Sequence, residues 1–578
     1  MNARLRRAAV VGGVALAATL LVTSLTGAAT AGAKANRLGC DRTSRAKSWS
    51  FGVMGDTQWT VADDGKNPNT VPVDIIKQVN QQFIRQHVKF VVAVGDLCDD
   101  GSIAGEDTRA VFAQSLYNAG IGFYPLIGNH DDGYADAQEF TTIYPQTQSA
   151  VMNKTPDSAF AVTNPDAATQ PFPKRAGKPF QIGTISTDAA APVGWAGLDY
   201  AVNYRNVRLV FLDQFASSDP NDTSGHEALN DADVQWMNDQ LSKRPGGTHA
   251  FVFGHKGIIT ENHTDTLFGK NPSVNPDLQN TFINDLQANG VRYYIGGHDH
   301  MNNRAIVSSP NGASSVEDVI IQSDSSKFYI PKNPTNDNVW DNPTRETQIA
   351  QQAVGPTADG ATATVHVGYY IFHVCGPRVT VDCYSAPVTA TNDGGEFLLA
   401  TTPKLCFEKV DTFGYSLNGK QTIVDEGQSY AGISDSFQGT TVQLLGGTND
   451  STATDVAGRP LHETVDTGWN RAGRCSGLKS NVLTLWGLTD LGSDRTSTYA
   501  LSMNYGSDSG RKSMLLTRDC GRWVNAVDAN AGGRDRRVVG PWKADYKLGT
   551  WGVDPSTHTV WAVVNHDGKF AVGRECGR

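Results

Sequence analysis

The chain has 578 residues, more than one hydrophobic core usually organises, so we expect at least two domains. Its composition, 39% hydrophobic and 19% charged, is that of a globular protein and excludes wholesale disorder. The formal charge of -10, with no dense Lys/Arg cluster, argues against nucleic-acid binding as the main task.

The N-terminus has the pattern of an export signal. Arg4, Arg6 and Arg7 precede an apolar stretch, and small residues follow through Ala33. Residues 1–33 are therefore predicted to be a signal peptide that is removed, which makes the mature protein secreted or cell-surface located. A membrane anchor is the alternative, but the run is short and interrupted by glycine, and no other segment approaches the roughly 20 apolar residues of a span. The paired arginines also leave the twin-arginine route open.

From Trp49 to about Gly297, short apolar runs alternate with stretches of helical periodicity. Strands are expected at 49–55, 90–95, 123–128, 207–213, 249–254 and 291–295, and helices at 73–86, 108–118, 231–243 and 277–289. This alternation predicts an α/β layered fold with a largely parallel sheet.

After about Ala305 the helical periodicity fades, and segments 319–322 and 369–374 read as strands that close the first domain. From about Cys406, short strands alternate with turn residues, which is typical of an all-β, sandwich-like region. We place the catalytic domain at 45–395 and the accessory β-region at 405–578, either as one domain or as two small ones split near residue 470.

Two features of the β-region have alternative interpretations. Asp567-Gly568 separates the apolar runs 560–564 and 570–572 and predicts a hairpin. Several tryptophans could form a carbohydrate platform, although tryptophan in β-domains more often fills the core. They are Trp486, Trp523, Trp542, Trp551 and Trp561.

Eight cysteines, an even number, suit an oxidising compartment and predict disulfides. The absence of a CxxC pair disfavours a structural zinc knuckle. Cys375 and Cys383 are close enough in sequence to close one hairpin, and Cys40 with Cys98 is a second candidate pair, but the sequence does not fix the connectivity.

Polar residues cluster just beyond the predicted strands, where open α/β sheets place their ligands. Five short motifs occur there in order: Asp56-Thr57-Gln58, Gly95-Asp96, Gly128-Asn129-His130-Asp131, Gly254-His255 and Gly297-His298-Asp299-His300. Their carboxylate, amide and imidazole donors suit Mn, Fe or Zn better than Mg or Ca.

The order and placement of these motifs resemble the calcineurin-like metallophosphoesterase superfamily over roughly residues 49–386, and GNHD followed much later by GHxH is the specific part. The resemblance implies an αββα sandwich with two divalent or mixed-valence transition metal ions. It assigns Asp56, Gln58 and His300 to one ion, Asn129, His255 and His298 to the other, and Asp96 to both.

Gln58 departs from the commoner family pattern, which has histidine at this position. An amide oxygen is a weaker donor than imidazole for a transition metal ion, so the first ion is expected to bind loosely. One branch of the superfamily also carries glutamine here. The alternative is that Gln58 only hydrogen-bonds near the site.

His130 matches the family's catalytic histidine, which faces the leaving group and can protonate the departing alkoxide. Asp99 matches the aspartate that orients this histidine in the Ser/Thr phosphatase branch; Asp99 and Asp100 could equally be a solvated loop pair. Purple acid phosphatases place a tyrosine ligand at this position, and its absence argues against an Fe(III)-tyrosinate centre.

Four other side chains have two readings each. His226 and His263 could touch substrate or be ordinary loop histidines, and Lys256 could meet a phosphate or be solvated. Cys98 could be a nucleophile, but a disulfide or a buried thiol is the more usual state.

The expected function is that of a secreted dinuclear-metal hydrolase of phosphate esters, in which a hydroxide bridging the metals attacks phosphorus and His130 assists the leaving group. A phosphomonoesterase is the first choice and a diesterase of nucleotides or phospholipid head groups the alternative; the insertion at 134–200 could wall the site and decide between them. The alternative from another class is a cell-surface binding protein with a residual metallo-domain, which would contact the cell wall through its C-terminal region.

Overall fold

The structure is a computed structural model. It describes residues 48–58, 71–99, 103–147, 191, 194–215, 227–259, 261–270, 274–330, 345–401, 403–472, 477–505 and 512–574, and short strands at 174–175, 178–179 and 184–185. The predicted signal peptide, Cys40, Asp100, His226 and most of the 134–200 insertion lie outside the described residues. None of the described helices combines the length and the apolarity that crossing a bilayer requires.

The first sheet of the catalytic region is built around β1 (Trp49–Met54), a strand whose residues are nearly all buried. Parallel strands flank it on one side and a long antiparallel hairpin on the other. The order is β15 (Lys327–Tyr329), β20 (Glu396–Leu398), β19 (Arg378–Asp393), β18 (Thr362–Cys375), β1, β2 (Phe90–Ala93) and β3 (Gly122–Pro125), with β17 (Gly355–Pro356) on β18 and β21 (Glu408–Ser416) on β19.

The second sheet is parallel at its centre and antiparallel at its edges. Its order is β16 (Glu346–Gln352), β13 (Asn302–Ser308), β14 (Ser315–Ile320), β12 (Tyr293–Gly296), β9 (His249–Phe253), β8 (Val207–Phe211), β7 (Tyr200–Tyr204) and β6 (Thr184–Ile185). The short hairpins β4–β5 (Lys174–Arg175, Lys178–Pro179) and β10–β11 (Asp265–Thr266, Gly269–Lys270) stand apart from it.

The two sheets stack face to face through an aromatic core. The ring of Phe51 lies 4.7 Å from that of Phe372 in its own sheet and 5.6 Å from that of Phe251 in the other. Strands buried on both faces read as near-continuous apolar runs, which is why the sequence located them well.

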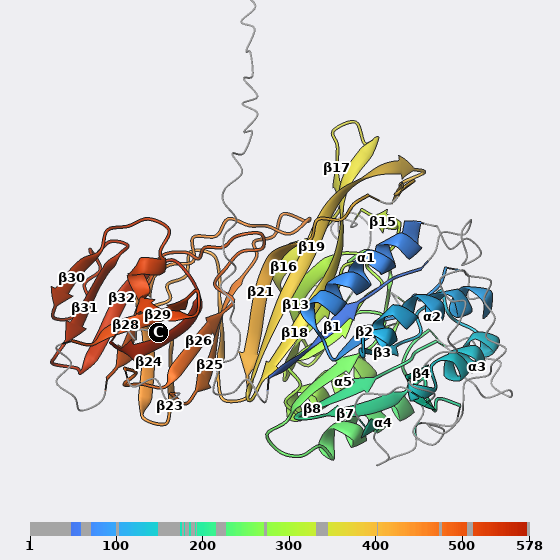
Figure 1. Ribbon diagram of the computed structural model, residues 1–578, viewed down its shortest axis with the longest axis horizontal. Helices are drawn as coiled ribbons and strands as arrows, with labels where there is room; N and C mark the ends of the chain where they lie inside the picture. The colour runs from blue at the N-terminus through green and yellow to red at the C-terminus, as the bar shows by residue number, and fades with distance from the viewer. Residues whose placement is uncertain are drawn as a thin grey trace, which may run out of the picture.

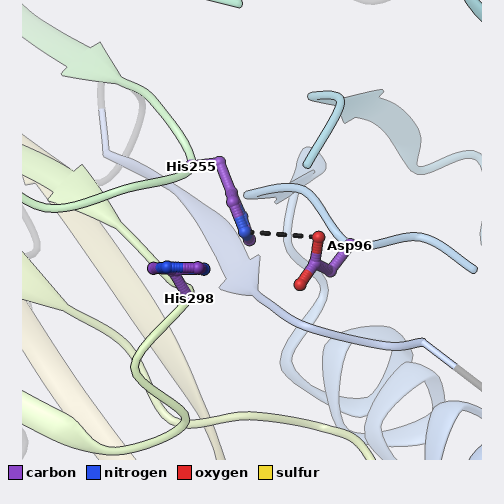
Figure 2. A group of neighbouring side chains, drawn as sticks. All are labelled: Asp96, His255 and His298. Carbon is purple, nitrogen blue, oxygen red and sulfur yellow. Dashed lines mark ion pairs between the residues drawn. The ribbon is translucent and has the colours of Figure 1, made fainter. Parts of the chain in front are cut away.

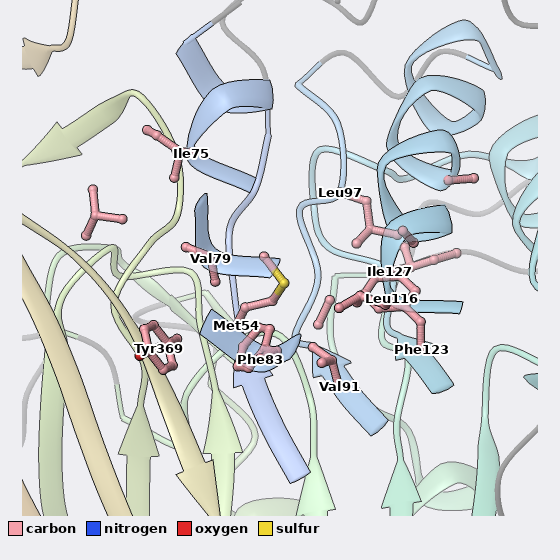
Figure 3. Close-up of a cluster of buried hydrophobic side chains, with 14 of the residues drawn as sticks. Met54, Ile75, Val79, Phe83, Val91, Leu97, Leu116, Phe123, Ile127 and Tyr369 are labelled. Atoms are coloured by element: carbon pink, nitrogen blue, oxygen red, sulfur yellow. The ribbon is translucent and has the colours of Figure 1, made fainter. Parts of the chain in front are cut away.

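Helices cover the outer faces of both sheets (Figure 1). The first sheet carries α1 (Val71–Gln86), α2 (Ile103–Asn118), α3 (Tyr134–Ile143) and the 3-10 turn η2 (Pro145–Thr147); the second carries α4 (Asp231–Ser242) and α5 (Pro276–Ala288). On α1, Ile75, Val79 and Phe83 recur at helical spacing and pack onto the sheet beside Val91 (Figure 3). The αββα architecture is therefore confirmed, but as two mixed sheets rather than one largely parallel sheet.

The C-terminal region is a sandwich of two six-stranded sheets around one core. One sheet has the order β22 (Gln421–Val424), β25 (Glu463–Asn470), β26 (Val482–Trp486), β33 (Gly568–Gly573), β28 (Met514–Asp519) and β29 (Arg522–Asn525). The other has β23 (Ser434–Phe437), β24 (Thr440–Gly447), β27 (Tyr499–Asn504), β32 (Thr559–Val564), β31 (Thr550–Asp554) and β30 (Arg536–Val539), and η3 (Ala526–Ala529) is a 3-10 turn.

Sheet membership differs from the predicted boundaries at two places. β21, which we assigned to the accessory region, pairs with β19 in the first catalytic sheet. β25 and β26, on either side of the proposed split near 470, pair with each other. β21 thus joins the two regions, and β25 and β26 lie beside it (Figure 1).

The hairpin predicted at Asp567-Gly568 is wrong. β32 pairs with β27 and β31, whereas β33 pairs with β26 and β28 in the opposite sheet. The turn therefore carries the chain across the sandwich. The apolar side chains of both strands reach the common core from opposite sheets, and an Asp-Gly turn signal does not distinguish this crossing from a hairpin.

Four of the five tryptophans are buried, which confirms their interpretation as core residues: Trp486 (0% exposed), Trp561 (1%), Trp523 (8%) and Trp551 (8%).

Both candidate disulfides are wrong. Cys383 is a buried free thiol in β19, and the thiol of Cys98 donates to Asp131 Oδ1 at 3.3 Å. Sequence proximity brought Cys375 and Cys383 into one hairpin without making them partners, because they lie at different heights along it.

Candidate metal centre

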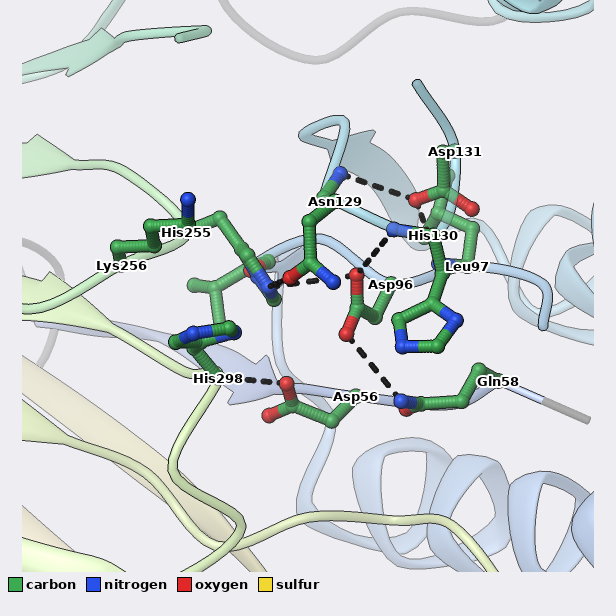
Figure 4. Close-up of polar contacts among 12 residues, drawn as sticks. Asp56, Gln58, Asp96, Leu97, Asn129, His130, Asp131, His255, Lys256 and His298 are labelled. Atoms are coloured by element: carbon green, nitrogen blue, oxygen red, sulfur yellow. Dashed lines mark hydrogen bonds and ion pairs between the residues drawn. The ribbon is translucent and has the colours of Figure 1, made fainter. Parts of the chain in front are cut away.

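The five motifs meet where the carboxyl ends of the parallel strands from both sheets face each other. Asp56, Asp96 and Asn129 follow β1, β2 and β3, and His255 and His298 follow β9 and β12 (Figure 4). Each residue lies within four positions of the end of its strand. The strand-end placement predicted from the sequence is therefore confirmed.

The backbone of these loops is tightly constrained. Asp56, Asp96, His298 and His300 have φ values of 48°, 49°, 70° and 52°, in the left-handed region that non-glycine residues rarely occupy. Glycine is needed beside them: a Cβ at Gly128 would lie 2.1 Å from Asp96 Oδ1, and one at Gly297 would lie 2.6 Å from Asp56 Oδ2. The recurrent glycines of the motifs thus make room for carboxylates.

One group of possible ligands consists of Asp56, Asp96 and His300, which are buried and offer atoms within 4.8 Å of one another. His300 Nδ1 lies 2.7 Å from Lys327 O. Since a carbonyl only accepts, Nδ1 carries the hydrogen and Nε2 keeps its lone pair, and burial lowers the pKa of His300 to about 3. Asp56 Oδ2 is buried and has no hydrogen-bond partner within the described part of the chain.

The second group consists of Asp96, His255 and His298 (Figure 2). His255 Nδ1 lies 2.8 Å from Val94 O and therefore carries a hydrogen. Its Nε2 lies 3.0 Å from Asn129 Oδ1 and 3.3 Å from Asp96 Oδ1. Three atoms that carry lone pairs converge, an arrangement that requires a proton or a cation among them.

The centre does not readily hold two ionised carboxylates without added positive charge. Burial raises the pKa of Asp56 to about 8, against the opposing effect of His255. Burial acts in the same sense on Asp96, but the imidazoles of His255 and His130 hold the pKa of that carboxyl well below its usual range. With an unpartnered carboxylate oxygen and a mixed oxygen and nitrogen donor set, the residues fit transition metal ions bound around Asp96.

Gln58 is buried beside the first group, with its amide nitrogen toward the centre. Nε2 donates to Asp96 Oδ2 at 3.2 Å and lies 3.3 Å from His300 Nε2, while Oε1 is buried without a partner among the described residues. These contacts are compatible with both interpretations of Gln58. As placed, its amide nitrogen donates a hydrogen bond to Asp96, and a 180° rotation of the amide would direct its oxygen to the centre as a ligand.

His130 sits at the mouth of the centre with 30% of its side chain exposed. Its Nδ1 lies 2.8 Å from the backbone oxygen of Asp99 and 3.7 Å from the carboxylate Oδ1 of the same residue. Asp99 is buried, at 7% exposure, so it is not a solvated loop residue. It faces His130 mainly through its carbonyl, and this leaves Nε2 of His130 for proton transfer.

Two aspartates in the motifs bind loops together, a role the sequence did not assign. Asp131 accepts from the backbone N–H groups of Leu97, Cys98 and Gly128 at 2.8–3.0 Å. Asp299 accepts from the N–H groups of Glu261 and Asn262. Their place as the last or middle Asp of GNHD and GHDH was the only available signal.

The remaining candidates have clear positions. The ring of His263 lies against that of His298, with ring centroids 3.9 Å apart and the planes tilted by 33°, and its Nδ1 lies 3.0 Å from Asp299 Oδ1. Lys256 is 1% exposed and bonded to Asp265, so the solvated reading is wrong. Cys98 is buried and bonded to Asp131, as expected of a structural thiol. Asp265, which contacts both Lys256 and His298, was missed because no motif contains it.

Residues 50–302 match the family model described as calcineurin-like phosphoesterase. This part of the chain belongs to that family. The match ends just after the GHDH motif and covers all five motifs of the centre. The chain thus carries a metallophosphoesterase domain, and phosphoester hydrolysis with bound metal is the activity of that domain.

Solved structures of several proteins are similar to parts of the chain, at low identity. GAP50, the anchor in the inner membrane complex of Plasmodium, is 14% identical over 63% of this chain and 90% of its own, with a TM-score of 0.31. The purple acid phosphatase PPD1 of yellow lupin is 13% identical over 64% and 54% (TM-score 0.36), and a dimetal phosphatase of Danio rerio 12% over 60% and 99% (0.33). No curated protein matches the chain. Similarity this low says nothing about the substrate.

Proposed function

We propose that the protein is an exported phosphomonoesterase that uses two transition metal ions, Mn, Fe or Zn. Asp56, Gln58 and His300 would hold one ion and Asn129, His255 and His298 the other, with Asp96 shared. When bound, such ions supply a nucleophile at neutral pH and neutralise charge on the phosphoryl oxygens.

The convergence of lone pairs around Asp96 carries this proposal. Nε2 of His255, Oδ1 of Asn129 and Oδ1 of Asp96 face one another, and Asp56 presents a buried carboxylate oxygen without a partner in the described residues. A residual metallo-domain would have lost some of these groups, whereas every one of them is present and oriented inward (Figure 4).

The choice of ester is tested by measuring turnover of an aryl phosphate and of the matching diaryl phosphate with Mn²⁺ or Zn²⁺ added. Faster, chelator-sensitive turnover of the monoester is expected. Faster turnover of the diester would overturn the monoesterase assignment in favour of a diesterase of nucleotides or phospholipid head groups. No chelator-sensitive turnover of either would overturn the hydrolase itself.

His130 is proposed to protonate the departing alcohol. Its Nδ1–H donates to Asp99 O, so the exposed ring directs Nε2 outward to a bound ester. His130→Asn should lower kcat for an alkyl phosphate by about 10²–10⁴. It should lower kcat much less for a nitrophenyl ester, whose leaving group needs no proton, and leave the metal content unchanged. Equal losses on both esters would contradict this role. The matched control is His373→Asn, at the end of β18 that lies away from the centre, and it should leave kcat for both esters unchanged.

Export is proposed from the charged and apolar pattern of residues 1–33. Mass spectrometry of the protein from a secreting host should give a mature chain that begins near residue 34, in the culture medium or on the cell surface. A full-length chain retained inside the cell would contradict export without affecting the proposed chemistry.

A further inference from the structure

The three histidines of the centre have different hydrogen-bond partners behind them. His255 and His300 each place Nδ1 against a backbone carbonyl, of Val94 and Lys327. His298 instead places Nε2 at 3.3 Å from a carboxylate oxygen, Oδ1 of Asp265. The contact between His298 and Asp265 thus lies beside the second ligand group only.

Asp265 lies on the hairpin β10–β11, outside every motif recognised in the sequence. Its second oxygen, Oδ2, is 2.6 Å from Lys256 Nζ. Lys256 directly follows His255 and is buried, and its ammonium also lies 4.7 Å from the ring of Phe215. A continuous chain of contacts thus runs from Lys256 through Asp265 to His298.

The contacts from Lys256 through Asp265 fix the tautomer of the His298 ring. An ionised carboxylate can only accept, so Nε2 carries the hydrogen and Nδ1 keeps the lone pair that can bind an ion. A carboxylate behind a histidine also holds the ring in place and increases its strength as a donor. Lys256 balances the carboxylate charge where little water reaches it.

We propose that Asp265, held by Lys256, is a positioning residue that sets the tautomer and orientation of His298 for the second metal ion. The inference rests on the proposed function, since it presumes that His298 binds an ion. The two metal positions then differ in strength. The ion beside His298 is the more tightly bound, because its group has two imidazoles, one of them backed by a carboxylate, whereas the single histidine of the other group, His300, has only a carbonyl behind it.

The test is a Mn²⁺ titration of the full chain, wild type against Asp265→Ala and Asp265→Asn, with bound metal measured by calorimetry and elemental analysis. Wild type should bind two ions with distinct affinities. Asp265→Ala should weaken the tighter site about 10–100-fold, and Asp265→Asn, which keeps an acceptor oxygen, should weaken it less. The affinity of the other site should stay within a factor of two.

The chain offers a matched control in Asp382. Its carboxylate also lies between a histidine and a lysine, 3.2 Å from His373 Nε2 and 3.4 Å from Lys409 Nζ, but at the opposite end of the first sheet. Asp382→Asn should therefore change neither affinity. A comparable loss in this control would show that the effect of Asp265 is general and overturn the proposal.

A second readout covers the case in which a variant is merely unstable. Nitrogen-15 NMR of labelled histidine should show His298 with hydrogen on Nε2 in the metal-free wild type and a mixed tautomer in Asp265→Ala. An unchanged tautomer, or two unchanged metal affinities, would overturn the positioning role. Failure of the wild type to bind two ions would instead overturn the proposed function.

Discussion

The metal-facing loops and the C-terminal sandwich use the same unusual backbone conformation in opposite settings. In the loops, the non-glycine residues with positive φ are Asp56, Asp96, His298 and His300, all buried. In the sandwich they are Gln438, Cys520 and His558, each exposed at a turn between paired strands. At an exposed turn, a positive φ lets the chain reverse direction. At a buried strand end, it orients the side chain toward the centre.

Buried aspartates from the two regions differ in their hydrogen bonds. In the sandwich, Asp435 Oδ2 accepts from Thr467 Oγ1 at 2.6 Å and from Trp469 Nε1 at 2.7 Å. At the metal-facing edge, Asp56 Oδ2 and Gln58 Oε1 have no partner in the described residues. Buried oxygens without a partner also occur elsewhere in the described residues, as at Asn525 of the sandwich. Those of Asp56 and Gln58 indicate a cation site because they lie among the other candidate ligands, Asp96 and His300.

Asp96→Asn should produce the largest effect and sharpen this contrast. It removes the charge shared by both metal groups, so kcat/KM should fall by about 10⁴-fold, equivalent to ~5.5 kcal/mol of transition-state stabilisation. Saturating Mn²⁺ at 100 times Kd should stabilise the wild type by about 2.7 kcal/mol and the variant far less. Kinetics and calorimetric melting with and without metal measure both; equal metal stabilisation would contradict the assignment.

Arg304→Ala should change stability and spare chemistry. Arg304 is buried where β21 joins the catalytic region to the C-terminal sandwich. It lies 3.0 Å from Glu317 and 3.3 Å from Asp411 of β21, and its guanidinium is 3.8 Å from the ring of Phe413. Its removal leaves two buried carboxylates uncompensated and should lower the free energy of unfolding by about 3–5 kcal/mol. Urea unfolding measures this loss of stability. The control is Lys77→Ala, at an exposed ion pair with Asp74, which should lower the free energy of unfolding by less than about 1 kcal/mol. Lost activity in the folded variant would show that the junction also shapes the centre.

Asp318→Asn tests a buried carboxyl behind the metal-facing loops. Asp318 Oδ2 accepts from the N–H groups of Ile258 and Ile259, and burial raises the pKa of Asp318 to about 8. Because the folded pKa lies above the unfolded value of 3.8, the unfolded chain releases its proton first, and stability falls as pH rises from about 4 to 8.

The asparagine variant keeps an acceptor but cannot ionise, so it escapes this loss. Between pH 5 and 8 the wild type should lose about 2 kcal/mol relative to the variant, less than the full slope of about 1.4 kcal/mol per pH unit because water can enter the loop. Denaturant unfolding at several pH values measures the difference. Parallel stability curves would show that Asp318 ionises normally.

Gln58→His should give the smallest effect. Imidazole is a stronger donor than an amide oxygen, so the first metal ion should bind about tenfold more tightly, or ~1.4 kcal/mol, in a competition titration with a chelator. Unchanged affinity would show that Gln58 serves only as the hydrogen-bond donor to Asp96 that the contacts describe.

Much of the catalytic sandwich could be predicted because its signals are local. Apolar runs and helical periodicity located β1, β2, α1 and α5 to within a few residues, and the motifs placed Asp96 and His298 at strand ends. Periodicity does not report which strands pair. The division into two sheets, the attachment of β21 to β19 and the crossing at Asp567-Gly568 depend on contacts between distant segments.

The sequence by itself determined the set of candidate ligands and its order, since glycine and metal-binding residue types must adjoin at each strand end for carboxylates and imidazoles to meet. The tertiary structure alone decided what stands behind those ligands. Asp265, on the hairpin β10–β11, contacts His298 across 33 residues of sequence, and the same carboxylate pairs with the buried Lys256. No local pattern encodes such a contact, since it depends on where two separate loops come to rest on the packed sheets.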